Sequence, residues 1–442
     1  MDDTTALAAL TTYRADVYGC CTRRRDAVFD LGDALATHQG ETSLVRVSRA
    51  PSYQRRFASV YQALGHGRLD QKALRAVHVR TAPRPAAGER LLLAVDASNV
   101  ARPYARTSPD RTLVQVPAQG YVLPGGGTLA RPGWAYSTVA VVPPVPSGWT
   151  HTLDTCRIPS DQTATTIGAA QLAALVPLLP ERPLCLGDGG YCTRGWLQAT
   201  AALPVDQLIR AAATRVLYRP APTRTGHRGR PCLDGARFKG SDPATQGTPD
   251  ATWEGKGADG RAVRVRCWGN LHLRTARDIP LTAVSLTRPT ASGSYALWLW
   301  WVGGPLPPLA TLPHLYAARF GIEHAFKMDK GDLLWTTPHL REPAQMDTWT
   351  QLVTIVHNEI GLARPLAQAH RFPWEAADRP LSPAQVRRDL PRIFSHCGSP
   401  ALRPRPRGKS PGRPPGLVPT PAPRHPVIRK NPKTRPKRAS AP

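Results

Sequence analysis

The sequence predicts an α/β core that is interrupted by a β-rich insertion, preceded by a helical region and followed by a basic tail. Three observations support this class: helical periodicity in the first 85 residues, short apolar runs from Leu91 onwards, and a Pro- and Arg-rich end. The 442 residues, 41% of them hydrophobic, can bury a large core and still supply accessory regions. We expect the segments 1–85, 86–212, 213–290, 291–397 and 398–442.

The chain is strongly basic, with a formal net charge of +27 and a pI near 10.6. Residues 400–442 hold twelve basic residues and no acid, so the remainder of the chain is also basic. This charge predicts a polyanionic partner, with nucleic acid as the first candidate. The tail has too little large apolar content to offset its ordering entropy, and we expect it to be disordered.

The first 85 residues have the spacing of amphipathic helices. One helical face would carry Phe57, Val60, Tyr61 and Leu64. A second helix follows a glycine-bounded turn, and Asp70 is placed to cap its start. Two interpretations remain open: a helix-turn-helix that reads a DNA end, and a helical subdomain that only packs against the core.

Short apolar runs predict the strands of the core, and they lie at 91–95, 136–142, 151–156 and 183–187. A helix that starts at Asp161 or Thr163 stands between the third and fourth of these runs. Three strands, a helix and a strand is the order of an RNase H-like domain, although other α/β folds share it.

Residues 213–290 contain β-prone runs separated by glycine turns, and they predict the β-rich insertion. The apolar strand 297–302 comes next, and the chain then becomes helical through Glu323. Helical spacing returns from Pro343 to about Leu366.

Two aspartates follow predicted strands directly. Asp96 closes the run that starts at Leu91, and Asp188 closes the run that starts at Pro183. Because open α/β sheets bind ligands at the carboxyl ends of their strands, we expect these carboxylates to converge. Mg²⁺ takes oxygen ligands and leaves positions free for phosphate oxygens, but a third acid is needed. Competing acids are Asp154, Asp161, Asp206 and Asp332.

The third acid belongs to a spaced set, Y-x₂-R-x₃-E-x₆-K, formed by Tyr316, Arg319, Glu323 and Lys330. This set resembles the YREK signature of bacterial insertion-sequence transposases of the DDE superfamily, in the group with a β-strand insertion. The segment Asp96-Ala97-Ser98 is similar to the first motif of that family, and Asp188-Gly189-Gly190-Tyr191 is similar to the second. The resemblance covers roughly residues 90–365, and its specificity lies in three motifs in order.

The resemblance implies that Asp96, Asp188 and Glu323 are the catalytic residues and that they bind two Mg²⁺ ions, with Mn²⁺ as a substitute. It implies metal-dependent hydrolysis at the ends of a mobile element, followed by strand transfer into target DNA. The expected partners are double-stranded DNA, at terminal inverted repeats and at the target, and a second copy of the chain. We expect the protein in the bacterial cytoplasm, associated with the nucleoid.

Several basic and polar residues are candidates for DNA contacts. The resemblance implies that Tyr316, Arg319 and Lys330 contact phosphates near the scissile bond, and their helical spacing places them on one face. Arg228 and Arg230 belong to an Arg-Gly-Arg-Pro segment like the core of an AT-hook. For that segment, minor-groove reading and general phosphate attraction both remain open.

Some aromatic and sulfur residues have more than one interpretation. In related transposases an aromatic residue of the insertion holds a flipped base, a role open to Trp253 and Trp268, although most tryptophans are core residues. Cys185 and Cys192 flank Asp188 without a CxxC pair, so buried thiols explain them better than zinc does. Prolines interrupt the apolar span 295–316, which excludes a membrane helix there.

Two other functions remain as alternatives. One is a DNA-binding protein of the same fold without catalytic activity, and the intact set of acids argues against it. The other is an RNase H-like nuclease that cuts without strand transfer. An assay that scores both cleavage and joined products separates them.

Overall fold

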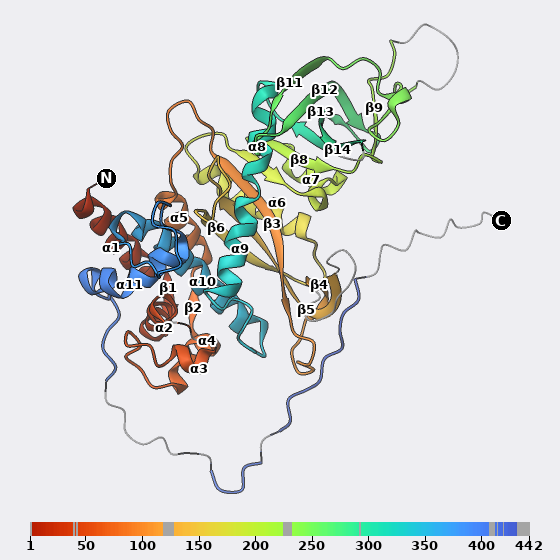
Figure 1. The fold of residues 1–442 in the computed structure, drawn as a ribbon. Coiled ribbons are helices and arrows are strands. Elements are labelled where there is room, and N and C mark those ends of the chain that lie inside the picture. Colours follow the sequence, from red (N-terminus) through yellow and green to blue (C-terminus); the bar gives the residue numbers. More distant parts are fainter. Residues whose placement is uncertain are drawn as a thin grey trace, which may run out of the picture.

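In the computed structural model a large mixed β-sheet forms the centre of the molecule (Figure 1). The structure describes residues 2–38, 40, 43–117, 128–223, 232–290, 293–405, 412, 414–418 and 420–430. The strands are β3 (Leu92–Ala101), β4 (Thr112–Pro117), β5 (Thr128–Val141), β6 (His151–Ile158), β7 (Leu184–Gly187), β8 (Asp206–Ala211), β9 (Val216–Tyr218), β10 (Arg237–Lys239), β11 (Ala251–Lys256), β12 (Ala262–Leu273), β13 (Ala276–Thr290) and β14 (Gly293–Val302). Their order is β10-β9-β12-β13-β14-β8-β7-β3-β5-β4, with β11 beside β12 and β6 beside β5. The predicted α/β class is confirmed.

Helices cover both faces of the central strands. The apolar residues of β3 alternate between two cores, with Leu93 and Val95 in one and Leu92 and Ala94 in the other. The first core includes residues of α6 (Ala164–Leu175) and α7 (Arg194–Thr200), and Thr163 caps α6. The second core lies under α8 (Leu312–Ala318), α9 (Gly321–Gly331) and α10 (Pro343–Ala363).

The N-terminal region is helical, as predicted, and it packs around α10. Its elements are α1 (Asp3–Cys20), α2 (Arg25–Thr37), α3 (Leu44–Val47), α4 (Ala58–His66) and α5 (Gln71–Thr81), with the short strands β1 (Cys21–Arg23) and β2 (Arg68–Leu69). Asp70 caps α5 by accepting from the backbone N–H groups of Lys72 and Ala73. A further helix, α11 (Pro383–Cys397), joins this group. None of the described helices has the length and hydropathy that a membrane crossing requires.

The expected apolar face of α4 is wrong in part. Val60 and Leu64 are buried, whereas Phe57 and Tyr61 are 45% and 44% exposed. Helical periodicity places all four near one stripe, but only part of that stripe meets the rest of the protein.

The β-rich segment extends the central sheet. β14 pairs with β13 on one side and with β8 on the other, so hydrogen bonds run without interruption from the core into this segment. One of the glycine turns expected in residues 213–290 follows Lys256 and joins β11 to β12. Trp268 is fully buried and stacks on Trp298 at 5.5 Å, which contradicts a role in holding a flipped base. Trp253 is half-buried against the core.

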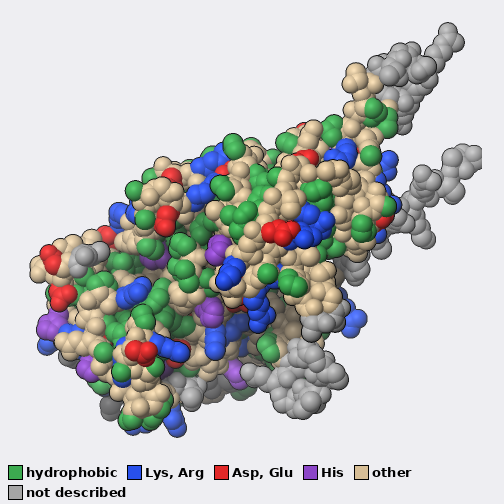
Figure 2. Space-filling model, turned by 45° about the horizontal axis from the view of Figure 1, so that its top comes forward, with side chains coloured by type: hydrophobic (Ala, Val, Ile, Leu, Met, Phe, Trp, Pro, Cys, Tyr) green, Lys and Arg blue, Asp and Glu red, His purple; other side chains and the backbone are tan. Residues whose placement is uncertain are grey.

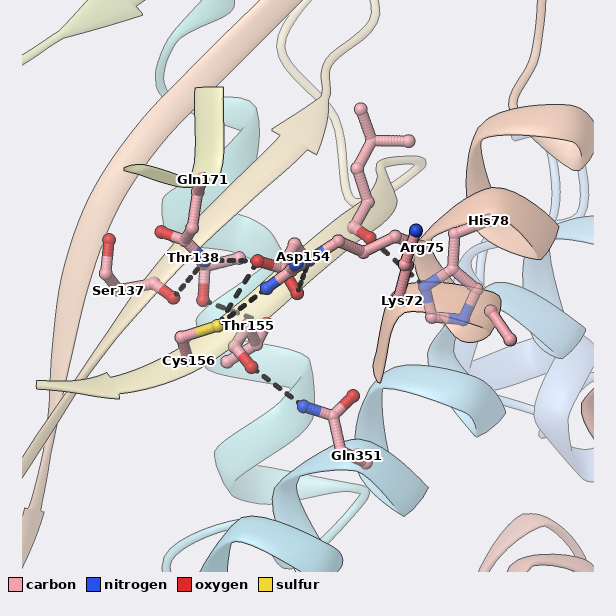
Figure 3. Close-up of polar contacts among 12 residues, drawn as sticks. Lys72, Arg75, His78, Ser137, Thr138, Asp154, Thr155, Cys156, Gln171 and Gln351 are labelled. Atoms are coloured by element: carbon pink, nitrogen blue, oxygen red, sulfur yellow. Dashed lines mark hydrogen bonds and ion pairs between the residues drawn. The ribbon is translucent and has the colours of Figure 1, made fainter. Parts of the chain in front are cut away.

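Polar contacts attach α5 to the edge strand β6 (Figure 3). The Arg75 guanidinium lies 3.0 Å from Asp154, and the Gln171 amide donates to the same carboxylate at 3.0 Å. The next residue of β6 is Thr155, whose carbonyl accepts a hydrogen bond from the Gln351 amide at 2.8 Å. Asp154 therefore has a structural role, and Asp206 has one too because it pairs with Arg90 and Arg182.

Part of the tail has defined contacts, which corrects the expectation that the whole tail is disordered. Ile428 forms a β-bridge with Thr112 at the free edge of β4, and the His425 N–H donates to the Arg106 carbonyl at 2.8 Å. Composition predicted disorder because the segment lacks a core of its own, but an unpaired strand edge supplies backbone partners that need no apolar side chain.

Two buried histidines at the α5–β6 contact make the fold sensitive to acid. His78 donates to the Leu153 carbonyl, and His151 donates to the His78 carbonyl at 2.9 Å. Burial lowers the pKa of His78 to about 4 and that of His151 to about 3. The folded state therefore keeps both rings neutral at a pH where the unfolded chain takes up protons.

We expect the free energy of unfolding to fall as the pH is lowered from about 6.5 towards 4. Each histidine should contribute about 1.4 kcal/mol for each pH unit below its unfolded pKa. Urea titrations at pH 7.5 and 5.5 measure this difference. His151→Gln should reduce it, and substitution of the exposed His314 should leave it unchanged. An equal pH dependence in His151→Gln and the unsubstituted protein would contradict the prediction.

Candidate active site

Two neighbouring parallel strands place Asp96 and Asp188 side by side. β3 pairs with β7 in parallel, and the last pair in the register is Val95 with Gly187. The next residue of each chain segment is an aspartate, so both carboxylates leave the sheet at the same level. Strand alternation directs both towards the face that α9 covers, the face to which Ala94 and Leu186 also belong. The predicted convergence of the two aspartates is supported by this register.

The local setting of Asp96 differs from the expected strand end. β3 continues to Ala101 because β5 goes on pairing with it, from Asp96 opposite Thr138 to Ala101 opposite Gly133. β7 does end at Gly187, and Asp188 then accepts from the Gly190 N–H at 2.8 Å at the start of a short turn. Asp96 is therefore a mid-strand residue that lies where only one neighbouring strand stops.

Glu323 comes from the first turn of α9, and the helix before it is broken. The helix expected from Tyr316 to Lys330 is interrupted, because α8 ends at Ala318 and α9 begins at Gly321, although Arg319 and Glu323 still pair at the i, i+4 spacing. Hydrogen bonds of the tighter i to i−3 type connect the two helices, including the Glu323 N–H to the Phe320 carbonyl at 3.1 Å. Arg319 lies in this break, between the end of α8 and the start of α9.

Arg319 connects two of the three predicted acids. Its guanidinium lies 3.6 Å from the Asp96 carboxylate and 2.7 Å from the Glu323 carboxylate, and its side chain is only 6% exposed. The guanidinium also packs over the Phe320 ring at 4.7 Å. Asp96 and Glu323, far apart in the sequence, therefore lie on two sides of one buried cation.

The site has more negative charge than Arg319 neutralises. Burial, together with the negative charge of Asp188, raises the pKa of Asp96 to about 6. The Ala97 N–H, which donates to this carboxylate at 2.7 Å, and the Arg319 charge act in the opposite direction. A buried carboxylate beside a second carboxylate favours binding of an added cation.

The donor chemistry fits a hard divalent cation, although the ligand set is not assembled. Among the described residues, no three His, Cys, Asp or Glu side chains gather closely enough to hold a metal ion. Asp96 and Asp188 are adjacent, whereas the Glu323 carboxylate is occupied by Arg319. Carboxylate oxygens are the ligands that Mg²⁺ and Mn²⁺ prefer. To join a shared site, Glu323 would have to release Arg319.

The remaining predicted contact residues differ in exposure. Tyr316 is 3% exposed, and its hydroxyl has no hydrogen-bond partner among the described residues. Lys330 lies over the Phe326 ring at 5.9 Å, and burial lowers the pKa of its amine. Arg228 and Arg230 lie outside the described residues. Phosphate contacts by these residues stay predictions.

Sequence reasoning missed Arg210, which extends the row of charged residues by one strand. β7 pairs with β8 in parallel, and Gly187 lies opposite Ile209, so Arg210 follows at the level of Asp188. The side chain is exposed, and its guanidinium lies 3.5 Å from the Tyr295 hydroxyl. A single arginine that ends the apolar run Leu208-Ile209 was the available signal, but only the strand order places it here.

Comparison with family models assigns the chain to a known family. The fold and site define an α/β protein with an acidic centre suited to divalent cations. A family model described as DDE superfamily endonuclease matches residues 16–272, which is more than half of the chain. The protein belongs to this family. The match includes Asp96 and Asp188 and ends before Glu323.

Two further comparisons are less informative. No curated protein matches the chain. A cryo-EM structure of a piggyBac transposase synaptic complex with hairpin DNA is similar at a TM-score of 0.41 and 9% identity, over 90% of this chain and 80% of that one. A similarity at this level does not tell what the present chain binds.

Neutralising Asp96 should stabilise the metal-free protein. Asp96→Asn removes a charge that burial and Asp188 disfavour, and we expect a gain of about 1–2 kcal/mol at pH 7.5 in the presence of a chelator. The gain is smaller than the full pKa difference because the Asp96 side chain is 18% exposed. It should shrink as the pH falls through 6, where Asp96 itself takes up a proton.

Urea denaturation measures this gain, and Asp161→Asn in an exposed position is the matched control. Added Mn²⁺ should stabilise the unsubstituted protein and have little effect on Asp96→Asn. A loss of stability in Asp96→Asn would show that the carboxylate contributes more through its hydrogen bonds than it costs.

Proposed function

We propose that this protein is a DNA transposase that hydrolyses phosphodiester bonds at the ends of a mobile element and joins the freed ends to target DNA. The observation that carries the proposal is the placement of Asp96 and Asp188 at one level of adjacent parallel strands, with Glu323 across Arg319. Membership of the DDE superfamily endonucleases supports the hydrolytic step. The insertion-sequence origin rests on the YREK spacing alone.

Asp96, Asp188 and Glu323 would hold the divalent cations, Mg²⁺ or Mn²⁺. When bound, such cations activate a water or a 3′-hydroxyl as the nucleophile and stabilise the leaving oxygen. The chain's own residues prepare the site before cations arrive. Asp96 is kept in a partly buried position by the Ala97 N–H and by Arg319, and Asp188 is fixed by the Gly190 N–H.

Basic residues around the acids would position the DNA. When Glu323 turns to a cation, the guanidinium of Arg319 becomes free to bind a phosphate in its place. Arg210 would bind a phosphate on the other side of Asp188, and the buried hydroxyl of Tyr316 is available as a donor near both. Each of these groups lies on the face of the sheet where the carboxylates lie.

The partners would be double-stranded DNA and a second copy of the chain. Blue Lys and Arg side chains are spread over the face seen in Figure 2, in keeping with the net charge of +27. Two DNA ends have to be brought together for joining, so we expect a homodimer on DNA.

Substitution of the acids should abolish cleavage without abolishing DNA binding. Asp96→Ala, Asp188→Asn and Glu323→Gln should each lower the cleavage rate more than about a hundredfold, because each removes a cation ligand. The assay incubates the protein and Mg²⁺ with DNA from its own genomic flanks and scores cleaved and joined products on gels.

Asp161→Asn should cleave at the unsubstituted rate in this assay. Cleavage without joined products would favour the nuclease alternative, and an Asp188→Asn protein that cuts at full rate would exclude the proposed centre. DNA binding without any cleavage by the unsubstituted protein would favour the inactive alternative.

Arg210→Ala should lower single-turnover cleavage by about tenfold, the cost of one charge-assisted phosphate contact in a partly exposed place. The matched control is Arg194→Ala, which removes another exposed arginine on α7, over the opposite face of the sheet. Comparable losses in both variants would mean that Arg210 contributes only general charge.

A further inference from the structure

The surface of α3 and α4 exposes aromatic and apolar side chains that the fold does not use. Val45, Phe57 and Tyr61 are 48%, 45% and 44% exposed, although α4 buries Val60, Ala63 and Leu64 on its inner side. The Phe57 and Tyr61 rings contact each other edge to face, with centroids 5.4 Å apart. In the part of the chain that the structure describes, more than two fifths of each of these two side chains stays open to solvent.

Several arginines lie close to these rings in the sequence, and acid is absent from the same stretch. Residues 43–69 contain Arg46, Arg49, Arg55, Arg56 and Arg68 and no Asp or Glu. Arg55 is occupied by Asp30 and by the Leu402 carbonyl, and Arg68 donates to the Gly67 carbonyl.

The other three arginines are exposed, and within the described residues none of them forms an ion pair. Arg46, Arg49 and Arg56, together with Val45, Phe57 and Tyr61, are called the α3–α4 surface below. It combines uncompensated positive charge with aromatic faces open to solvent.

We propose that the α3–α4 surface binds unpaired, single-stranded DNA. Guanidinium groups attract the phosphates of any nucleic acid, but an aromatic face gains a partner only where bases are unstacked. In an intact duplex each base face is covered by the neighbouring base. A duplex would therefore contact the arginines through its phosphates and offer Phe57 and Tyr61 no base on which to stack. The inference rests on the proposed action on DNA and does not require the acidic centre.

The test is fluorescence anisotropy with the full chain in a chelator, so that cleavage cannot occur. The probes are a labelled oligo-dT and a duplex of equal length. The variant Phe57→Ala with Tyr61→Ala should bind the single strand about tenfold more weakly, as expected for lost stacking, and the duplex less than twofold more weakly. The variant Phe57→Leu with Tyr61→Phe should lose less affinity for the single strand, because the aromatic ring that remains on α4 can still stack on a base.

A second variant separates charge from stacking. Replacing Arg46, Arg49 and Arg56 with alanine should weaken both probes and reduce the salt dependence of binding. The matched control replaces Phe372 and Trp374 with alanine. These two exposed rings also stack on each other, at 4.8 Å, but Arg388, which lies over the Phe372 ring, is paired with Glu375, and loss of the rings should not change binding.

Three outcomes would overturn the proposal. Unchanged single-strand affinity in the variant that replaces both Phe57 and Tyr61 with alanine, with an unchanged thermal melt, excludes stacking. An equal loss for the duplex indicates a wedge in the minor groove, and a changed oligomeric state with unchanged DNA binding indicates a protein interface. The binding assay contains a chelator and the cleavage assay requires Mg²⁺, so failure of the cleavage assay and failure of this inference remain distinguishable.

Discussion

The arrangement of the site depends on a buried arginine that lies between acidic side chains. Asp96, Asp188 and Glu323 repel one another, and the repulsion grows as burial removes water from Asp96. Arg319 offsets it by contacting Asp96 and Glu323 together. Arg319 lies at the break between α8 and α9, so the residue that joins two of the acids belongs to neither helix.

The central sheet supplies the frame in which that balance is possible. Parallel pairing of β3, β7 and β8 sets Asp96, Asp188 and Arg210 at one level, so carboxylate, carboxylate and guanidinium leave three neighbouring strands together. The sheet extends through β14 into the β-rich segment, and its other margin is covered at β6 by α5 and touched at β4 by the tail. Because these edges are covered or paired, the sheet holds Asp96, Asp188 and Arg210 in fixed relative positions.

Net charge alone overstates how much of the chain is free to meet DNA. Arg14 is buried and forms ion pairs with Asp33 and Glu359. Its charge is therefore not available to bind DNA. Arg75 is similarly paired with Asp154. Among the described residues, Arg210 and the three arginines of the α3–α4 surface are exposed and form no ion pair. The arginines available to bind DNA are therefore better identified from their ion pairs in the structure than from the net charge of the chain.

The sequence by itself determined the features that depend on neighbouring residues: the cap at Asp70, the turn after Asp188, the long helix from Pro343 and the hairpin after Lys256. Tertiary structure alone decided which faces are covered. Periodicity could not show that Tyr61 points to solvent, or that β5 carries β3 past Asp96. The position of Arg210 depends on the strands that pair with β8, and these strands are distant in the sequence. A turn or a helix cap depends on a few neighbouring residues, whereas strand pairing joins segments whose relation no local pattern reveals.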